Sequence, residues 1–274
     1  MPDDAVFLTK LMAVAHLPVL EDWMAFLPAP PARMVLYVPA DPAVIAAARD
    51  FAEARPFPVQ IFEARPGENL RQAETVILQR LLDGATERYA MLVNLDTLPF
   101  RRGEEGWYDE VIRGIEADPA CVFFTATGRF HRADRPGIAP HLLRTQRFSN
   151  NFAIVELAFW RRAMTTWSME SVRGQGVERY HSEWALEQEL TATGEYGLRR
   201  LASDSWRVFH VHQWGPELFV TREKFRAGRG TQAYAAKAFE DVRHEWQGYF
   251  NGPKPPLLFR ARVALGAARR RWLG

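Results

Sequence analysis

The stretch Tyr89-Ala-Met-Leu-Val-Asn-Leu-Asp-Thr-Leu-Pro99 decides the fold of this chain. Ala90 to Val93 is a continuous apolar run, which is typical of a strand covered on both faces. Asn94 and Asp96 follow two positions apart, so their side chains leave the same side of an extended chain. Pro99 prevents this strand from continuing in the centre of a sheet. The stretch therefore predicts a buried strand that ends in a carboxylate.

Two explanations of Asp96 fit this position. An ionised Asp is costly at the end of a buried strand unless something pairs with it, and ligands bind at that edge of open α/β sheets. A divalent cation that carries a phosphorylated ligand would be a suitable partner. Alternatively, Asp96 caps a following helix. The stretch alone leaves both explanations open.

Apolar segments and helical repeats alternate around this stretch. Strands are expected at 6–14, 34–38, 58–62, 89–93 and 121–125, with helices at 16–27, behind the N-cap Asp41-Pro42, at 70–81 and at 107–115. This alternation predicts an α/β fold with a mostly parallel central sheet and helices on both faces. The Arg-, Pro- and Gly-rich residues 128–146 are predicted to form a surface loop. Further strands are expected at 152–155 and 206–212, and helices from 157 and over 182–193.

Composition limits the class of protein. The 274 residues suit one large or two small domains, and a net charge of +2 does not indicate nucleic-acid binding. The single cysteine excludes an internal disulfide and a Cys-based zinc site. The chain begins with acidic residues and has no apolar run long enough for a membrane span, so a cytoplasmic setting is expected. P-loop and hydrolase-elbow motifs are absent from the sequence.

The segment His181–Gly194 resembles the motif E-D-W-x-L-x-x-R-L-x-x-x-G of family 2-like glycosyltransferases with the GT-A fold. Ser182 stands at the Glu position, Glu183 at the Asp position and Glu189 at the Arg position. Three more segments resemble this family in the right order, namely Asn94-Leu-Asp96 at the D-x-D motif, Ser149–Ile154 before Ala158-Phe159, and Arg207–Gln213 as the terminal strand. The resemblance covers roughly residues 6 to 215.

The resemblance implies a glycosyltransferase that uses a nucleotide-sugar donor. The family's carboxylate at this motif is the general base of inverting enzymes, which implies that role for Glu183. Asp96 would bind Mn²⁺ or Mg²⁺, and Asn94 offers a neutral oxygen nearby. His210 and His212 point to one face of their strand, so either could complete the coordination, and we favour His212.

The remaining candidates concern donor and acceptor. Asp41 and Arg71 are predicted to contact the nucleotide, although a helix cap and a surface charge explain them equally well. The predicted acceptor contacts are Asn151, Trp184 and Trp214, with core packing as the alternative for both Trp residues.

The expected organisation is a GT-A-like domain at 1–215, with a nucleotide-binding half at 1–127 and an acceptor half at 128–215, followed by a basic helical extension at 216–274. Residues 257–274 carry five Arg among apolar residues and no acidic residue. Such a helix suits peripheral contact with the anionic inner face of a membrane, or it packs on the domain. The acceptor would be a glycan or a lipid-linked molecule.

Two other functions remain open. A catalytically inactive GT-A-like domain that binds glycan or membrane would explain the Asn at the first D-x-D position and the Ser at position 182. A nucleotidyltransferase on a similar sheet is less well supported, because no Gly-rich loop with a Lys follows the first strand.

Overall fold

The central sheet contains nine strands among the residues that the structure, a computed structural model, describes. These are residues 4–68, 70–101, 106–126, 134–139, 142–168, 170, 181–200, 206–211 and 214–226. The strands are β1 (Ala5–Lys10), β2 (Arg33–Val38), β3 (Val59–Glu63), β4 (Tyr89–Val93), β6 (Cys121–Thr125), β7 (Arg135–Ala139), β8 (Leu142–Thr145), β9 (Phe152–Glu156) and β10 (Tyr196–Arg200), in the spatial order β3-β2-β1-β4-β9-β6-β10-β8-β7.

Most strands of this sheet run in one direction. Strands β3, β2, β1 and β4 pair in parallel, and so do β6 and β10. Only β9 and β8 run against the others within the described ranges, because β9 is antiparallel to β4 and β6, and β8 is antiparallel to β10 and β7. The predicted α/β class and mostly parallel sheet are confirmed, although the sequence does not reveal that the strand at 152–156 is antiparallel.

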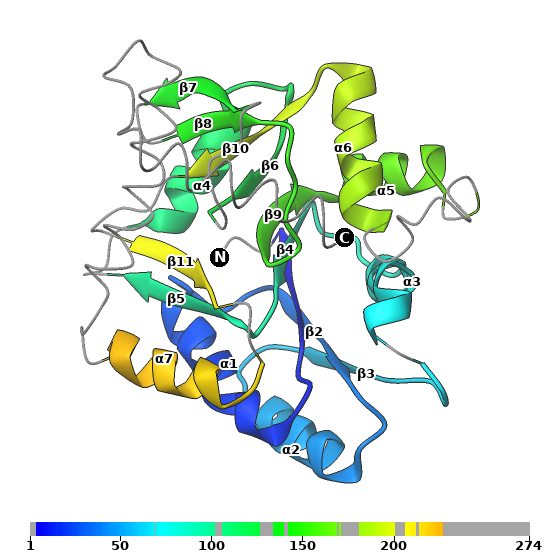
Figure 1. Cartoon of the computed structure of the whole chain (residues 1–274), viewed down its shortest axis with the longest axis vertical. Helices are drawn as coiled ribbons and strands as arrows, with labels where there is room; N and C mark the ends of the chain where they lie inside the picture. Colours follow the sequence, from blue (N-terminus) through cyan, green and yellow to red (C-terminus); the bar gives the residue numbers. More distant parts are fainter. Residues whose placement is uncertain are drawn as a thin grey trace, which may run out of the picture.

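Helices cover both faces of the sheet, as predicted (Figure 1). On one face lie α1 (Leu17–Phe26), which follows the short 3-10 helix η1 (Val14–His16), and α2 (Pro42–Glu53), α4 (Trp107–Glu116) and α7 (Pro216–Arg226). On the other lie α3 (Leu70–Leu82), α5 (Leu157–Thr166) and α6 (His181–Thr193). Strand residues alternate between the two cores, with Phe7 in the first and Leu8 in the second, as the period of two requires.

Much of the tryptophan content belongs to this interior. The Trp23 and Trp107 indole N–H groups donate to the backbone oxygens of Thr97 and Phe26 at 2.8 and 2.9 Å. Trp206 lies 5.5 Å from Trp107, measured between ring centroids. Buried indoles need such a partner for their N–H group, so these Trp residues are core residues and are not available to stack on a ligand.

A second, two-stranded sheet lies beside the central one. It pairs β5 (Thr97–Arg101) with β11 (Trp206–His210) in antiparallel fashion (Figure 1). Pro99 lies in β5, where a two-stranded sheet tolerates the missing N–H group. The strand predicted at 206–212 is therefore present from 206 to 210, but it belongs to this small sheet.

The prediction of a surface loop at 128–146 is wrong for its second half. Residues 135–139 and 142–145 form β7 and β8, which extend the central sheet. Leu142, Leu143 and Thr145 are buried where β8 pairs with β10. The composition suggested a loop because β8 is held by β10, about fifty residues away in sequence, and β7 is held in turn by β8, so a local pattern does not reveal the sheet.

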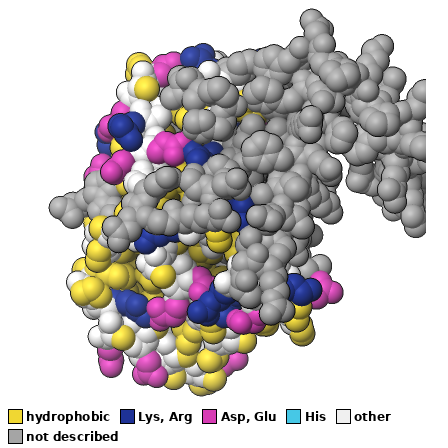
Figure 2. Space-filling view, turned by 90° about the vertical axis from the view of Figure 1, so that its left-hand side faces the viewer, with side chains coloured by type: hydrophobic (Ala, Val, Ile, Leu, Met, Phe, Trp, Pro, Cys, Tyr) yellow, Lys and Arg dark blue, Asp and Glu magenta, His cyan; other side chains and the backbone are white. Residues whose placement is uncertain are grey.

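Helix α7 packs on the body of the protein. Leu218 and Phe225 belong to the first core, and the Arg222 guanidinium binds both carboxylate oxygens of Asp22 on α1, with Nε–Oδ2 at 2.6 Å and Nη2–Oδ1 at 3.0 Å. The proposed division at 215/216 stays a prediction, and residues 227–274, which include the basic segment, lie outside the described residues. On the face shown in Figure 2, described side chains of both charge signs are interspersed, in keeping with the small net charge.

Replacing Arg222 by Met is expected to lower the free energy of unfolding by about 2 kcal/mol. The substitution leaves the Asp22 carboxylate without its bidentate partner in a partly buried position, so the loss should fall below that of a fully buried pair. Urea denaturation measures the change. The double variant with Asp22→Asn should lose less than the sum of the two single losses, and strict additivity would contradict a direct interaction.

Candidate functional site

The turn after β4 places Asp96 beside His210. The backbone N–H of Thr97 donates to the Asn94 carbonyl at 3.0 Å, which closes the turn. The chain then enters β5, and the antiparallel register sets His210 of β11 opposite Thr97. His210 Nε2 consequently lies 2.9 Å from Asp96 Oδ2, and the Val211 N–H donates to the Asp96 carbonyl at 2.9 Å. Asp96 therefore does not cap a helix, because a strand follows it.

One carboxylate oxygen of Asp96 lacks a partner. The residue is only 4% exposed, and Oδ1 is buried with no hydrogen bond among the described residues. Leaving a buried carboxylate oxygen unsatisfied costs free energy. An oxygen of this kind next to an imidazole fits a hard divalent cation, so the side chains of Asp96 and His210 are compatible with the predicted metal.

The described residues do not by themselves complete a metal centre. No group of three or more His, Cys, Asp or Glu side chains within the described ranges could hold a metal ion. The favoured third ligand, His212, lies outside these ranges.

Asn94 connects the β4 turn to the start of β9. Its backbone N–H donates to the Asn151 carbonyl at 3.0 Å, and its side-chain amide donates to Asn151 Oδ1 at 3.0 Å. The Asn151 amide in turn lies 3.2 Å from Ser149 Oγ. Asn94 and Asn151 thus hold each other, and their predicted roles in donor and acceptor binding stay predictions.

Asn150 continues this connection to α6. Its backbone N–H donates to Glu183 Oε1 at 3.0 Å, and its side-chain amide donates to Ser182 Oγ at 3.0 Å. A path of hydrogen bonds and two short backbone links therefore runs from His210 and Asp96 through the three Asn residues to Glu183. The Asn-Asn pair directly before a buried strand was visible in the sequence, but nothing there indicates that Asn150 contacts α6.

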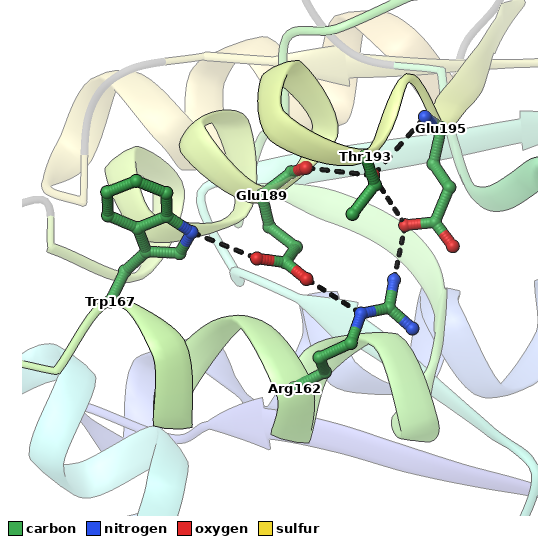
Figure 3. A network of polar contacts seen from close by, with 5 residues as sticks. All are labelled: Arg162, Trp167, Glu189, Thr193 and Glu195. Atoms are coloured by element: carbon green, nitrogen blue, oxygen red, sulfur yellow. Dashed lines mark hydrogen bonds and ion pairs between the residues drawn. The ribbon is translucent and has the colours of Figure 1, made fainter.

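Glu189 holds α6 against α5 (Figure 3). The carboxylate accepts from Arg162 Nε at 2.7 Å and from the Trp167 indole at 2.9 Å. Arg162 also pairs with Glu195, and Thr193 Oγ1 donates to the Glu189 carbonyl at 2.8 Å. Glu189 occupies the position where the resembling motif has Arg, and the structure accounts for this because the opposing positive charge is supplied by α5.

The other candidates occupy varied positions. Asp41 Oδ1 accepts from the backbone N–H of Ala43 at 2.9 Å. It therefore caps α2, which is the alternative to a nucleotide contact that the sequence offers for this residue. Trp184 is partly buried, with ring contacts to Trp167 and His181, and Trp214 is partly buried with its carbonyl 2.9 Å from His16 Nε2. Arg71 lies in the first turn of α3, and its side chain is outside the described part. The nucleotide and acceptor roles of these residues stay predictions.

No helix in the described ranges combines the length and apolar character that crossing a membrane requires.

Comparison with known proteins gives matches at the level of structure. No protein-family model and no curated protein matches the chain. The mannosyltransferase PcManGT from Pyrobaculum calidifontis, solved with GDP-Man and Mn²⁺, matches 98% of this chain and 82% of its own at 14% identity and a TM-score of 0.43. TarS residues 1–349 from S. aureus match over 90% of this chain and 72% of theirs, at 11% identity and a TM-score of 0.47.

The first of these structures is a mannosyltransferase by its own description. At this identity and at TM-scores below 0.5, the likeness carries no argument about activity, donor or metal. Those questions rest on the residues of this chain.

Proposed function

We propose that the protein is a metal-dependent glycosyltransferase that moves a sugar from a nucleotide-diphosphate donor to a glycan or lipid-linked acceptor. The observation that carries the proposal is the path of three hydrogen bonds and two short backbone links from the Asp96–His210 pair through Asn94, Asn151 and Asn150 to Glu183. The residues of this path come from all four segments that resemble the glycosyltransferase family. The path connects the side of the site that would hold a diphosphate with the side that would activate an alcohol.

Asp96 and His210 are the proposed ligands of a divalent cation, together with His212. The buried, unpartnered Oδ1 of Asp96 supports this assignment. A bound Mn²⁺ or Mg²⁺ would stabilise the charge that develops on the departing diphosphate. The carboxyl end of β1 lies beside that of β4 in the sheet and β2 follows on the other side of β1, so the nucleotide is proposed to lie over this edge, near Asp41 and Arg71.

Glu183 is the proposed general base. Its carboxylate accepts a hydrogen bond from a fixed backbone N–H group, which holds it in one orientation. A base placed in this way would take the proton of the acceptor hydroxyl while the alcohol attacks the sugar, which inverts the configuration at the transferred carbon. Asn151, Trp184 and Trp214 remain the proposed acceptor contacts.

One observation favours a second candidate, a catalytically inactive domain that binds glycan. The Asn94 amide, at the first position of the D-x-D-like motif, is engaged with Asn151 and so is turned toward the protein. An active transferase would then rely on Asp96 without help from this side chain.

Turnover of labelled nucleotide sugars separates the two candidates. The full chain is incubated with Mn²⁺ and a panel of UDP and GDP sugars, which includes GDP-mannose because the Pyrobaculum structure contains it. Release of the nucleotide diphosphate by the wild type, and its loss in Glu183→Gln, is the expected result. Binding of donors without turnover of any of them would favour the inactive domain.

A further inference from the structure

The segment from Arg147 to Asn151, here called the 147–151 segment, lies between α6 and the β4 turn. Along it, alternate backbone N–H groups point to α6, since Phe148 donates to Glu187 Oε1 at 3.3 Å and Asn150 donates to Glu183 Oε1 at 3.0 Å. Its last residue, Asn151, is bound to Asn94 on the other side. The segment therefore uses two carboxylates, one turn apart on α6, as acceptors for its backbone.

Glu187 makes a second contact with the segment. Besides the Phe148 N–H group, its carboxylate binds Arg147 Nη1 at 2.6 Å, and its side chain is 18% exposed. Arg199 from β10 donates to the Arg147 carbonyl at 3.3 Å and carries its own partner, Asp134. Three contacts from two elements thus fix the beginning of the segment.

We propose that Glu187 is a positioning residue for the site: together with Arg147 it fixes the 147–151 segment on α6, and this segment holds the Glu183 carboxylate and the Asn94 turn in place. The effect on catalysis that this inference predicts rests on the proposed function. Glu187 does not touch the reacting groups in this account, and it acts through Phe148, Asn150 and Asn151.

The proton occupancy of Glu187 makes this role dependent on pH. The pKa of Glu187 is raised to about 7, chiefly by burial and also by the nearby Glu183 charge, against the opposing effects of Arg147, the Phe148 N–H group and Arg199. Below pH 7 the acid is neutral, and above it the carboxylate is charged. Because the pKa of Glu187 is raised in this site above its value in water, ionisation favours a state in which the carboxylate is solvated, so the segment should be held less tightly above pH 7 than below it.

Two backbone amides report on the two carboxylates separately. In ¹⁵N-resolved NMR of the deuterated full chain, the Phe148 amide reports on Glu187 and the Asn150 amide on Glu183. We expect the wild-type Phe148 amide to titrate with a midpoint near pH 7. The Asn150 amide should show a smaller step at the same midpoint, because the segment connects the two. In Glu187→Gln both steps should disappear.

Two further variants test the sign of the effect. Glu183→Gln should lower the Phe148 midpoint by about half a pH unit, since a like charge is removed. Arg147→Met should raise it, since the partner of the ionised form is lost. Arg147→Met also tests the role of Glu187 if the Glu187→Gln variant does not fold. Glu21→Gln, which weakens the ion pair between Glu21 on α1 and Arg55, is the matched control and should leave both amides unchanged.

The pH dependence of transfer gives the catalytic readout. With a donor that is turned over, the wild-type kcat should fall as the pH rises through 7, and Glu187→Gln, whose side chain stays neutral, should lack this fall and keep an unchanged KM for the donor. A step in the Asn150 amide near pH 7 that persists in Glu187→Gln would overturn the inference. If the amides behave as expected while no donor is turned over, the positioning of the segment stands and the proposed function fails.

Discussion

Replacing Glu183 by Gln is expected to lower kcat for sugar transfer by about 10²- to 10⁴-fold, the range that a general base contributes. Gln keeps an oxygen that can accept from the Asn150 N–H group, so the 147–151 segment and the fold should be preserved. What is lost is the ability to take the proton of the acceptor hydroxyl. Steady-state kinetics with a labelled donor measure the change.

The binding of the donor separates this effect from damage to the site. Titration calorimetry with the nucleotide diphosphate and Mn²⁺ should give the same affinity for wild type and Glu183→Gln, because the base faces the acceptor. Glu195→Gln is the matched control, since it changes a carboxylate that follows α6 and pairs with Arg162. A Glu183→Gln variant with wild-type kcat would exclude this residue as the base.

The sequence contains enough to predict the sheet around β4. The apolar run from Ala90 to Val93 predicts a strand covered on both faces, and the structure places it fourth among nine strands with all five of its residues buried. The Asp41-Pro42 pair predicts the beginning of α2, and Asp41 Oδ1 caps that helix. Such features depend on neighbours in sequence, which explains why a local pattern suffices.

The pairing of distant segments could not be predicted in the same way. The register between β5 and β11 brings together Asp96 and His210, which are 114 positions apart. Alternation marks both His210 and His212 as members of one face of a strand, but it does not reveal which strand is the partner. The contact of His210 with Asp96 became visible only when the partner strand was known.

Side-chain partners from other elements were equally hidden. Glu189 appeared as a departure from the family motif, and its meaning depends on Arg162, which lies 27 positions earlier on α5. No local sequence pattern marks Asn150 or Glu187, because their roles depend on contacts between the 147–151 segment and α6. A polar residue on a helix face looks solvated in sequence until the element packed against it is known.

Replacing Asp96 by Asn is expected to reduce kcat/KM by about 10³-fold and to remove the dependence of donor binding on the metal. A metal ion contributes several kcal/mol to stabilising a departing diphosphate, and the substitution removes the one charge that the described part of the site offers to it. Asn retains an oxygen that can accept from His210 Nε2, so the pairing of β5 with β11 should persist. Calorimetry of a nucleotide diphosphate, with Mn²⁺ or with EDTA, measures the change.

The comparison between the two conditions decides what Asp96 does. In the wild type, EDTA should weaken binding of the nucleotide diphosphate, whereas in Asp96→Asn binding should be weak with or without the metal. Asp118→Asn, which changes a carboxylate bound to the Tyr196 hydroxyl, is the matched control and should behave as wild type. An Asp96→Asn variant that still binds the diphosphate more tightly with Mn²⁺ would show that the metal is held elsewhere. The buried Oδ1 would then require a different explanation, since a carboxylate oxygen without a partner costs stability and a ligand is what would offset that cost here.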